Sequence, residues 1–329
     1  MNCPIWVFKI MNAIPSISSQ IDEKIIFKVI DKHFSRLAPY YYKWINSWLI
    51  GAYENFGNID KYIILIYIIN QDFIFFRKNG LIVDYDTFYK DKTLEVDKIN
   101  ISKISRELQI PKESVRRKVE ELEKADIVKR KSRQIFVNRT AFTVVQAHLT
   151  LKNMSVLLCE FNKILKDENI VEVAYPTKEI SDSIKKNFSF VWYQFYKFLF
   201  IFTNRCRKEV GDLETFCIGL LVLVNSADNK KFRIKDLSLK NYATSIQGSD
   251  DRGVNTMSIS DVTGIPRITV IRKLKFLIKR NILQINEKKL ITLNISGVAL
   301  DEIQKLQNQN IKSLSNFIYR VFNQIKIII

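Results

Sequence analysis

Apolar and polar positions follow a distinctive order between about residues 99 and 139. Apolar residues recur there at i, i+3 and i+7, and again beyond Pro111 at i, i+4 and i+7, which predicts two short amphipathic helices. The two sets are Ile101, Ile104 and Leu108, and Val115, Val119 and Leu122. Pro111 suits the first turn of the second helix, where its missing N–H leaves no hydrogen bond unmade. Short apolar runs at 127–128 and 135–137, on either side of a basic turn, predict a β-hairpin after the helices.

The same order returns 155 residues later, at about 255–294. Ile104–Pro111 and Ile259–Pro266 align without a gap, and ten of the 25 positions aligned from the first isoleucine are identical. The same offset places the apolar run Ile63–Asn70 on Ile218–Asn225, so we expect a tandem duplication. Two helices with a tight turn, then a hairpin, describe a winged helix-turn-helix in each copy.

Each half of the chain repeats one order of elements around its motif. A long aromatic-rich helical segment comes first, then a short apolar helix, a polar irregular insert, the motif and a last amphipathic helix. The expected ranges outside the motifs are 21–56, 60–76, 78–98 and 140–167 in the first half, and 180–207, 213–226, 227–255 and 296–328 in the second. Charged and small polar residues with Pro176 mark a joint at 166–183, so we divide the chain into repeats 1–168 and 169–329.

The predicted fold is therefore mainly α. It is a tandem duplication of a helical unit that contains a winged helix-turn-helix with short β-hairpin wings, arranged as a pseudo-twofold intramolecular dimer. We interpret the aromatic stretches at 40–48 and 188–196 as core, because equivalent long helices that pack on each other need large apolar surfaces. The alternative is that these stretches line a ligand pocket.

Composition argues against most enzyme and membrane functions. The 329 residues hold four cysteines without a C-x-x-C pair and two histidines, His33 and His148, so neither a disulfide scaffold nor a metal site is indicated. No glycine-rich phosphate loop, nucleophile elbow or H-E-x-x-H motif occurs, so we expect no catalytic residues and no cofactor. No apolar run approaches the ~18–20 residues that span a bilayer, and no basic residue precedes the apolar start as in a signal peptide. We expect a cytoplasmic protein without a membrane partner.

The net charge of +18, from 52 Lys and Arg against 34 Asp and Glu, lies mostly on the two motifs. Residues 100–139 hold 12 basic and 6 acidic side chains and residues 255–294 hold 8 and 2, so the motifs together carry +12. A bias toward lysine codons would spread the charge evenly along the chain. Its concentration on the motifs indicates binding to duplex DNA through phosphate contacts.

The expected DNA-binding residues lie on the second helix and hairpin of each motif. Arginine can reach guanine edges or phosphates, and the backbone N–H groups at a helix start also favour phosphate. They are Lys112, Ser114, Arg116, Arg117, Arg130, Lys131 and Arg133 in the first motif, and Arg267, Thr269, Arg272, Lys275, Lys288 and Lys289 in the second. Glu113, Glu120 and Glu121 weaken the first surface, so we expect the second to contribute more. Ile268 and Ile271 are unusual on a solvated helix face, and contact with thymine methyl groups and packing against another domain both explain them.

These segments resemble the winged-helix motif of the MarR family of bacterial transcriptional regulators. The resemblance is carried by Ile104–Arg117, Leu122 and Ile127–Val128, and by their counterparts within Ile259–Leu283. It implies DNA-facing positions at Ser114, Arg117, Thr269 and Arg272. Family members are usually homodimers that place two recognition helices in successive major grooves, often released by a small ligand, so the resemblance implies a duplex-DNA partner and admits a small-molecule effector. The chain departs from the family in its long inserts, short hairpins and fusion of two units, and the fusion implies a monomer that acts as an intramolecular pseudo-dimer.

We therefore expect a sequence-specific, double-stranded-DNA-binding transcriptional regulator. Its two non-identical motifs would bind unequal, adjacent half-sites about one helical turn apart. One alternative is a replication initiator of the plasmid type, with tandem winged helices on directly repeated sites. Another is a scaffold whose winged helices bind proteins. Affinity for duplex DNA that falls steeply with salt separates the scaffold from both DNA-binding functions.

Overall fold

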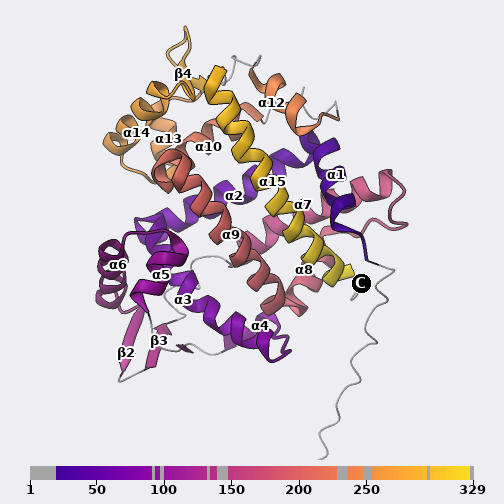
Figure 1. Cartoon of the computed structure of the whole chain (residues 1–329), viewed down its shortest axis with the longest axis vertical. Coiled ribbons are helices and arrows are strands. Elements are labelled where there is room, and N and C mark those ends of the chain that lie inside the picture. Colours follow the sequence, from indigo (N-terminus) through magenta and orange to yellow (C-terminus); the bar gives the residue numbers. More distant parts are fainter. Residues whose placement is uncertain are drawn as a thin grey trace, which may run out of the picture.

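The structure, a computed structural model, describes residues 20–90, 93–96, 100–131, 134–138, 147–227, 236–247, 253–294 and 297–326. Within these residues the protein is mainly helical with two small antiparallel sheets (Figure 1), which confirms the mainly-α prediction. The elements of the first half are α1 (Glu23–Lys32), α2 (Phe34–Phe56), α3 (Ile59–Lys78), α4 (Tyr85–Lys90), β1 (Thr93–Val96), α5 (Ile101–Leu108), α6 (Lys112–Lys124), β2 (Val128–Lys131), β3 (Gln134–Asn138) and α7 (Ala147–Asp167). Those of the second half are α8 (Thr177–Lys186), α9 (Phe188–Val210), α10 (Leu213–Ala227), α12 (Leu239–Gln247), α13 (Thr256–Thr263), α14 (Arg267–Lys279), β4 (Leu283–Ile285), β5 (Ile291–Leu293) and α15 (Gly297–Lys326).

Each of the two aromatic-rich segments is a pair of helices instead of one continuous helix. His33 separates α1 from α2 with φ −108° and ψ 29°, and Asn187 separates α8 from α9 with φ −103° and ψ 27°. At both breaks the backbone N–H still closes the preceding helix by donating to the carbonyl of Val29 or Ser183. The helical spacing of apolar residues continues across both breaks, which is why the sequence predicted single segments.

The larger of two apolar cores runs through both halves of the chain, and a smaller one lies within the second half, between α10, α13, α14 and the hairpin of β4 and β5. Trp44 of α2 lies against Phe195 and Phe198 of α9, with ring centroids 5.2 and 5.7 Å apart, and Phe317 of α15 lies 5.4 Å from the same indole. None of these four side chains is more than 3% exposed. The aromatic residues at these positions are therefore core, as we expected, and they join the long helices of the two halves.

The most extensive contacts between a helix of one half and a helix of the other half each have an equivalent in which the two halves are interchanged. Helix α2 packs on α10 while α9 packs on α3, and α1 packs on α15 while α8 packs on α7. An asparagine of the opposite half holds the segment before each first helix. Asn323 exchanges hydrogen bonds of 2.9 and 3.0 Å with the backbone of Ile21, and Asn162 bonds the backbone of Tyr175 (2.6 Å) and Val173 (3.2 Å). The predicted boundary at residue 168 thus does not separate two cores.

Candidate nucleic-acid interface

The two motifs begin and turn alike. Asn100 and Asn255 cap α5 and α13 by accepting a hydrogen bond from the backbone N–H three residues ahead, at 2.9 and 2.8 Å. Both helices end in the left-handed region, at Gln109 (φ 53°) and Gly264 (φ 68°). Glycine adopts this conformation without the steric cost that glutamine bears. The same backbone path therefore forms with and without glycine at the turn.

A serine hydroxyl holds each turn. Ser105 Oγ donates to the carbonyl of Ile110 at 2.7 Å, and Ser260 Oγ donates to the carbonyl of Ile265 at 2.8 Å. Both isoleucine side chains are buried, and the proline after each of them precedes the second helix, α6 or α14. The hydrogen bond and the buried isoleucine together fix the direction in which the second helix leaves the turn.

A hairpin follows each second helix, and the first hairpin gains a strand that the sequence did not predict. Strand β2 pairs with β3, β4 pairs with β5, and β1 joins the first sheet in the order β1-β3-β2. The expectation of irregular structure at 78–98 is wrong, because this insert holds α4 and β1, and the insert at 227–255 likewise holds α12. In the second motif a single bridge between Val254 and Ile291 stands where β1 stands in the first. Four residues of alternating burial are too short a pattern to recognise without the strand they pair with.

Two lysines on the second helices face inward and tie the motifs to the scaffold. Lys118 Nζ donates to Asn58 Oδ1 at 2.7 Å, and Lys273 Nζ donates to Asp212 Oδ1 at 2.6 Å. Asn58 and Asp212 cap α3 and α10, so each lysine reaches the start of the short apolar helix of its own half. Burial lowers the pKa of Lys118. Burial would raise the pKa of Asp212, but hydrogen bonds from Lys273 and Thr215 hold it below its usual value.

The sequence pattern does not distinguish these two lysines from the exposed cations of the same helices. Lys118 and Lys273 lie 155 residues apart, at equivalent positions of the two motifs, and their identity at those positions was the one signal available. In a charged helix, the sequence does not distinguish a lysine that points inward from one that points to solvent, because the partner of the ammonium group lies elsewhere in the chain. Neither side chain is free to contact a nucleic acid.

The predicted cations of the first motif lie at the surface, but several are held by carboxylates. The exposed residues are Lys112, Arg116, Arg117, Arg130 and Lys131, with Ser114 half-buried and Arg133 outside the described residues. Arg116 pairs with Glu113, and Arg130 pairs with Glu123. Arg117 Nε lies 3.8 Å from Glu121 Oε1. Exposed ion pairs add little stability, yet each neutralises part of the positive field that would attract phosphate.

The predicted cations of the second motif are freer. The exposed residues are Arg267, Arg272, Lys275, Lys288 and Lys289, with Thr269 half-buried. Helix α14 has no acidic residue, and none of the five cations forms an ion pair with another described residue. The unequal charge that we expected of the two surfaces is thus present in the structure.

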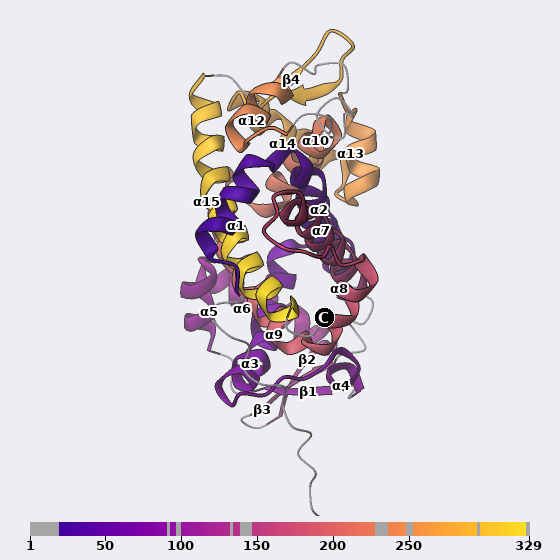
Figure 2. The same ribbon diagram turned by 90° about the vertical axis from the view of Figure 1, so that its right-hand side faces the viewer.

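Both motifs lie on one side of the molecule. In Figure 1, α13 and α14 are at the upper left and α5 and α6 at the lower left, with α2 and α9 between them. The hairpins extend toward opposite ends of the long axis, β4 at the top and β2 with β3 at the bottom, in both views (Figures 1 and 2). Along this side of the molecule, α6 and α14 therefore lie between the two hairpins.

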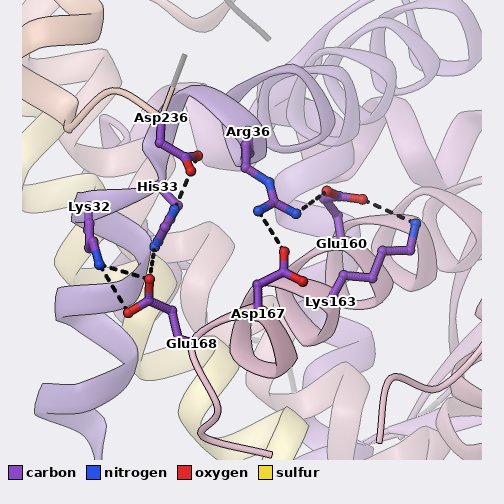
Figure 3. A network of polar contacts seen from close by, with 8 residues as sticks. All are labelled: Lys32, His33, Arg36, Glu160, Lys163, Asp167, Glu168 and Asp236. Atoms are coloured by element: carbon purple, nitrogen blue, oxygen red, sulfur yellow. Dashed lines mark hydrogen bonds and ion pairs between the residues drawn. The ribbon is translucent and has the colours of Figure 1, made fainter. Parts of the chain in front are cut away.

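A separate polar cluster joins the corner between α1 and α2 to the end of α7 (Figure 3). His33 is 4% exposed, with Nε2 2.8 Å from Glu168 Oε1 and Nδ1 3.1 Å from Asp236 Oδ1. Lys32 also pairs with Glu168 at 2.8 Å, and the hydrogen bonds from Lys32 and His33 lower the pKa of the Glu168 carboxyl. Arg36 extends the cluster along α7. We interpret the cluster as a clamp that holds the helix corner.

An apolar cavity of about 200 Å³ lies beside the second motif, between α10, α12, α14 and the first turns of α15. Its lining residues include Leu220, Leu223, Tyr242, Leu277 and Ile303. The corresponding place in the first half, between α3, α4 and the start of α7, holds only about 20 Å³. The large side chains of Trp48, Tyr62 and Trp192 line that smaller space. The two halves therefore differ in their interior as well as in their surface charge.

No protein-family model, curated protein or solved structure matches this chain. Within the described ranges no group of His, Cys, Asp or Glu side chains is arranged to hold a metal ion. Of the helices that the structure describes, none combines the length and the apolar character that crossing a membrane needs.

Proposed function

We propose that this protein is a tandem duplication of a MarR-like winged helix-turn-helix unit that binds double-stranded DNA sequence-specifically as a transcriptional regulator. The observation that carries the proposal is the repetition of one motif geometry, from cap to turn to second helix to hairpin, on one side of the molecule. Exposed cations lie on both second helices. A partner for two such surfaces must be negatively charged and must present the same structure twice. Duplex DNA meets both conditions, because its major groove recurs with every helical turn.

In this proposal α6 and α14 enter successive major grooves. The hairpins contact the flanking backbone or minor groove, and Lys118 and Lys273 fix how the two helices stand on the scaffold. In this proposal one chain supplies both recognition helices and acts as a monomer in the cytoplasm. The packing of α1 and α8 on the opposite halves supports the single-chain arrangement. The half-sites differ because the two helices differ. Binding of this kind needs no cofactor.

We propose the cavity beside α14 as the place where a small-molecule effector would act. It is mostly apolar, and Leu277 of α14 forms part of its wall, so an occupant would contact one motif directly. Leu223→Trp fills this space with a larger side chain. We expect the fluorescent apolar dye ANS to bind the wild-type protein and to lose that binding in the variant, and dye binding unchanged by Leu223→Trp would contradict this assignment.

Selection of binding sites from a pool of random duplexes tests the proposed function. We expect one chain per selected duplex, two unequal half-sites roughly 34 Å apart, and an affinity that falls steeply with salt. Absence of duplex affinity at low salt would contradict DNA binding and favour the protein scaffold. Sites arranged as direct repeats would favour a replication initiator. A perfect palindrome bound by two chains would contradict the pseudo-dimer.

A further inference from the structure

One pair of surface positions differs in chemistry between the two second helices. Glu113 and Arg116 form an exposed ion pair on α6. The equivalent positions on α14, 155 residues later, hold Ile268 and Ile271. Ile268 is 84% exposed and Ile271 is 38% exposed. Residues three apart lie on one face of a helix, so the two isoleucines form an apolar pair at the surface where α6 carries a charged pair.

The apolar pair is surrounded by cations. Arg267, Arg272 and Lys275 are exposed on the same helix, which has no acidic residue. Packing against another part of the described chain, which the sequence left open, does not explain Ile268, because its side chain is almost fully exposed. The partner of this face must therefore offer both apolar groups and negative charge.

Duplex DNA offers both along its major groove. Each thymine places a C5-methyl group in the groove, and isoleucine-sized apolar side chains can contact it while nearby cations contact the phosphates. An acidic protein surface would also attract the cations. A stable protein interface, however, buries about 800 Å² per partner around an apolar centre. Phe276 of α14 is also 42% exposed, and three apolar side chains on one helix are still a small centre for such an area. The combination favours the DNA groove.

We propose that α14 recognises thymine through Ile268 and Ile271. Their side chains contact thymine C5-methyl groups in the half-site of the second motif, and Arg267, Arg272 and Lys275 hold the neighbouring backbone or bases. This inference rests on the proposed DNA binding and adds a base preference to it. Helix α6 lacks the apolar pair, so the half-site of the first motif is recognised without such methyl contacts.

Replacement of thymine by deoxyuridine tests the proposal on a duplex selected from the random pool. Deoxyuridine keeps the pairing edge of thymine and lacks only the methyl group. With thymines replaced in one half-site at a time, we expect wild-type affinity to fall in one half-site only, by about fourfold for each contacted methyl group. The Ile268→Ala protein should discriminate less than the wild type, and a protein with both Ile268→Ala and Ile271→Ala should bind the thymine and deoxyuridine duplexes with nearly equal, reduced affinity.

Two variants serve as matched controls. Val262→Ala removes an exposed apolar side chain of α13, outside the proposed contact face, and Glu113→Ala changes the position on α6 that is equivalent to Ile268. Both proteins should discriminate thymine from deoxyuridine as the wild type does. The exposure of Ile268 predicts that its replacement leaves the unfolding midpoint unchanged, so lost discrimination can be separated from lost folding.

Three results would overturn the inference, and they differ in what they leave standing. Salt-dependent binding that is equal for thymine and deoxyuridine duplexes rejects the methyl contact but retains DNA binding. Absence of duplex binding at low salt rejects both. If Ile268→Ala keeps its duplex affinity and changes the oligomeric state in sedimentation, the isoleucine pair is a protein contact instead.

Discussion

Side chains at equivalent positions of α6 and α14 differ in charge although the backbone around them is the same. Arg117 and Arg272 align at an offset of 155 residues and are both exposed. Arg117 Nε, however, lies 3.8 Å from the Glu121 carboxylate, where α14 has Phe276. An arginine that already has a carboxylate neighbour must be shared with it or leave it to bind phosphate. If the motifs bind DNA as proposed, the two arginines should therefore contribute unequally to the affinity.

We predict that Arg272→Ala weakens affinity for the selected duplex more than Arg117→Ala does. Loss of an arginine contact typically costs about 1–3 kcal/mol, so we expect affinity to fall by about 5- to 150-fold for Arg272→Ala and by a smaller factor for Arg117→Ala. Fluorescence anisotropy at several salt concentrations measures both. Lys178→Ala, at an exposed position of α8, is the control that should change neither affinity nor salt slope. Equal losses for the two arginines would contradict the asymmetry.

At the scale of elements, α6 and α14 are each tied to the start of another helix by a hydrogen bond from a lysine. Periodicity along the sequence predicted α5, α6, α13 and α14, because each needs only one buried face to be visible. It did not predict β1, whose hydrogen-bond partner β3 lies about forty residues away. It also did not predict the breaks at His33 and Asn187, where apolar spacing continues although the chain changes direction.

The inward lysines should differ in what they contribute to stability. Lys273→Met removes the cation from Asp212, whose side chain is 43% exposed, and we expect the free energy of unfolding to fall by about 1 kcal/mol. Lys118→Met is the matched control, because its partner Asn58 is neutral and still accepts a hydrogen bond from Lys61. Urea denaturation measures both variants. A larger loss of unfolding free energy for Lys118→Met than for Lys273→Met would contradict the expectation that the ion pair with Asp212 makes Lys273 the more stabilising lysine.

The clamp at the corner of α1 and α2 should make stability depend on pH. Hydrogen bonds from Lys32 and His33 lower the pKa of Glu168 in the folded protein below its ordinary value of 4.5. A carboxyl with a lowered native pKa stabilises the fold above its unfolded pKa and loses that contribution as pH falls through the native value. Glu168→Gln should therefore unfold at lower urea than the wild type at pH 7, with a difference that shrinks below about pH 4.5. A difference that persists unchanged in acid would contradict the ion-pair role.

At the scale of the whole molecule, the two halves share a core and exchange helices. Helix α1 of the first half packs on α15 of the second, and α8 of the second packs on α7 of the first. An isolated half would expose the apolar faces that these contacts bury, which costs about 25 cal/mol for each Å² returned to water. A chain built in this way holds its two motifs in one fixed relation without a second subunit.

We predict that the fragments 1–168 and 169–329 do not fold separately and regain structure when they are mixed. Circular dichroism with thermal melting should show a cooperative transition for the mixture and none for either fragment alone. The intact chain is the control. Cooperative unfolding of either fragment by itself would contradict the shared core.

The sequence by itself determined the local structure of the motifs and the distribution of their charge. Helical periodicity, the turn before each proline and the acid-free α14 depend on neighbouring residues, so they are visible in one stretch of chain. Only the tertiary structure decided which half each helix packs on, that Lys118 and Lys273 point inward, that β1 joins the first hairpin and that Ile268 stands uncovered. These features depend on contacts between residues far apart in the sequence, so no local sequence pattern identifies the partners.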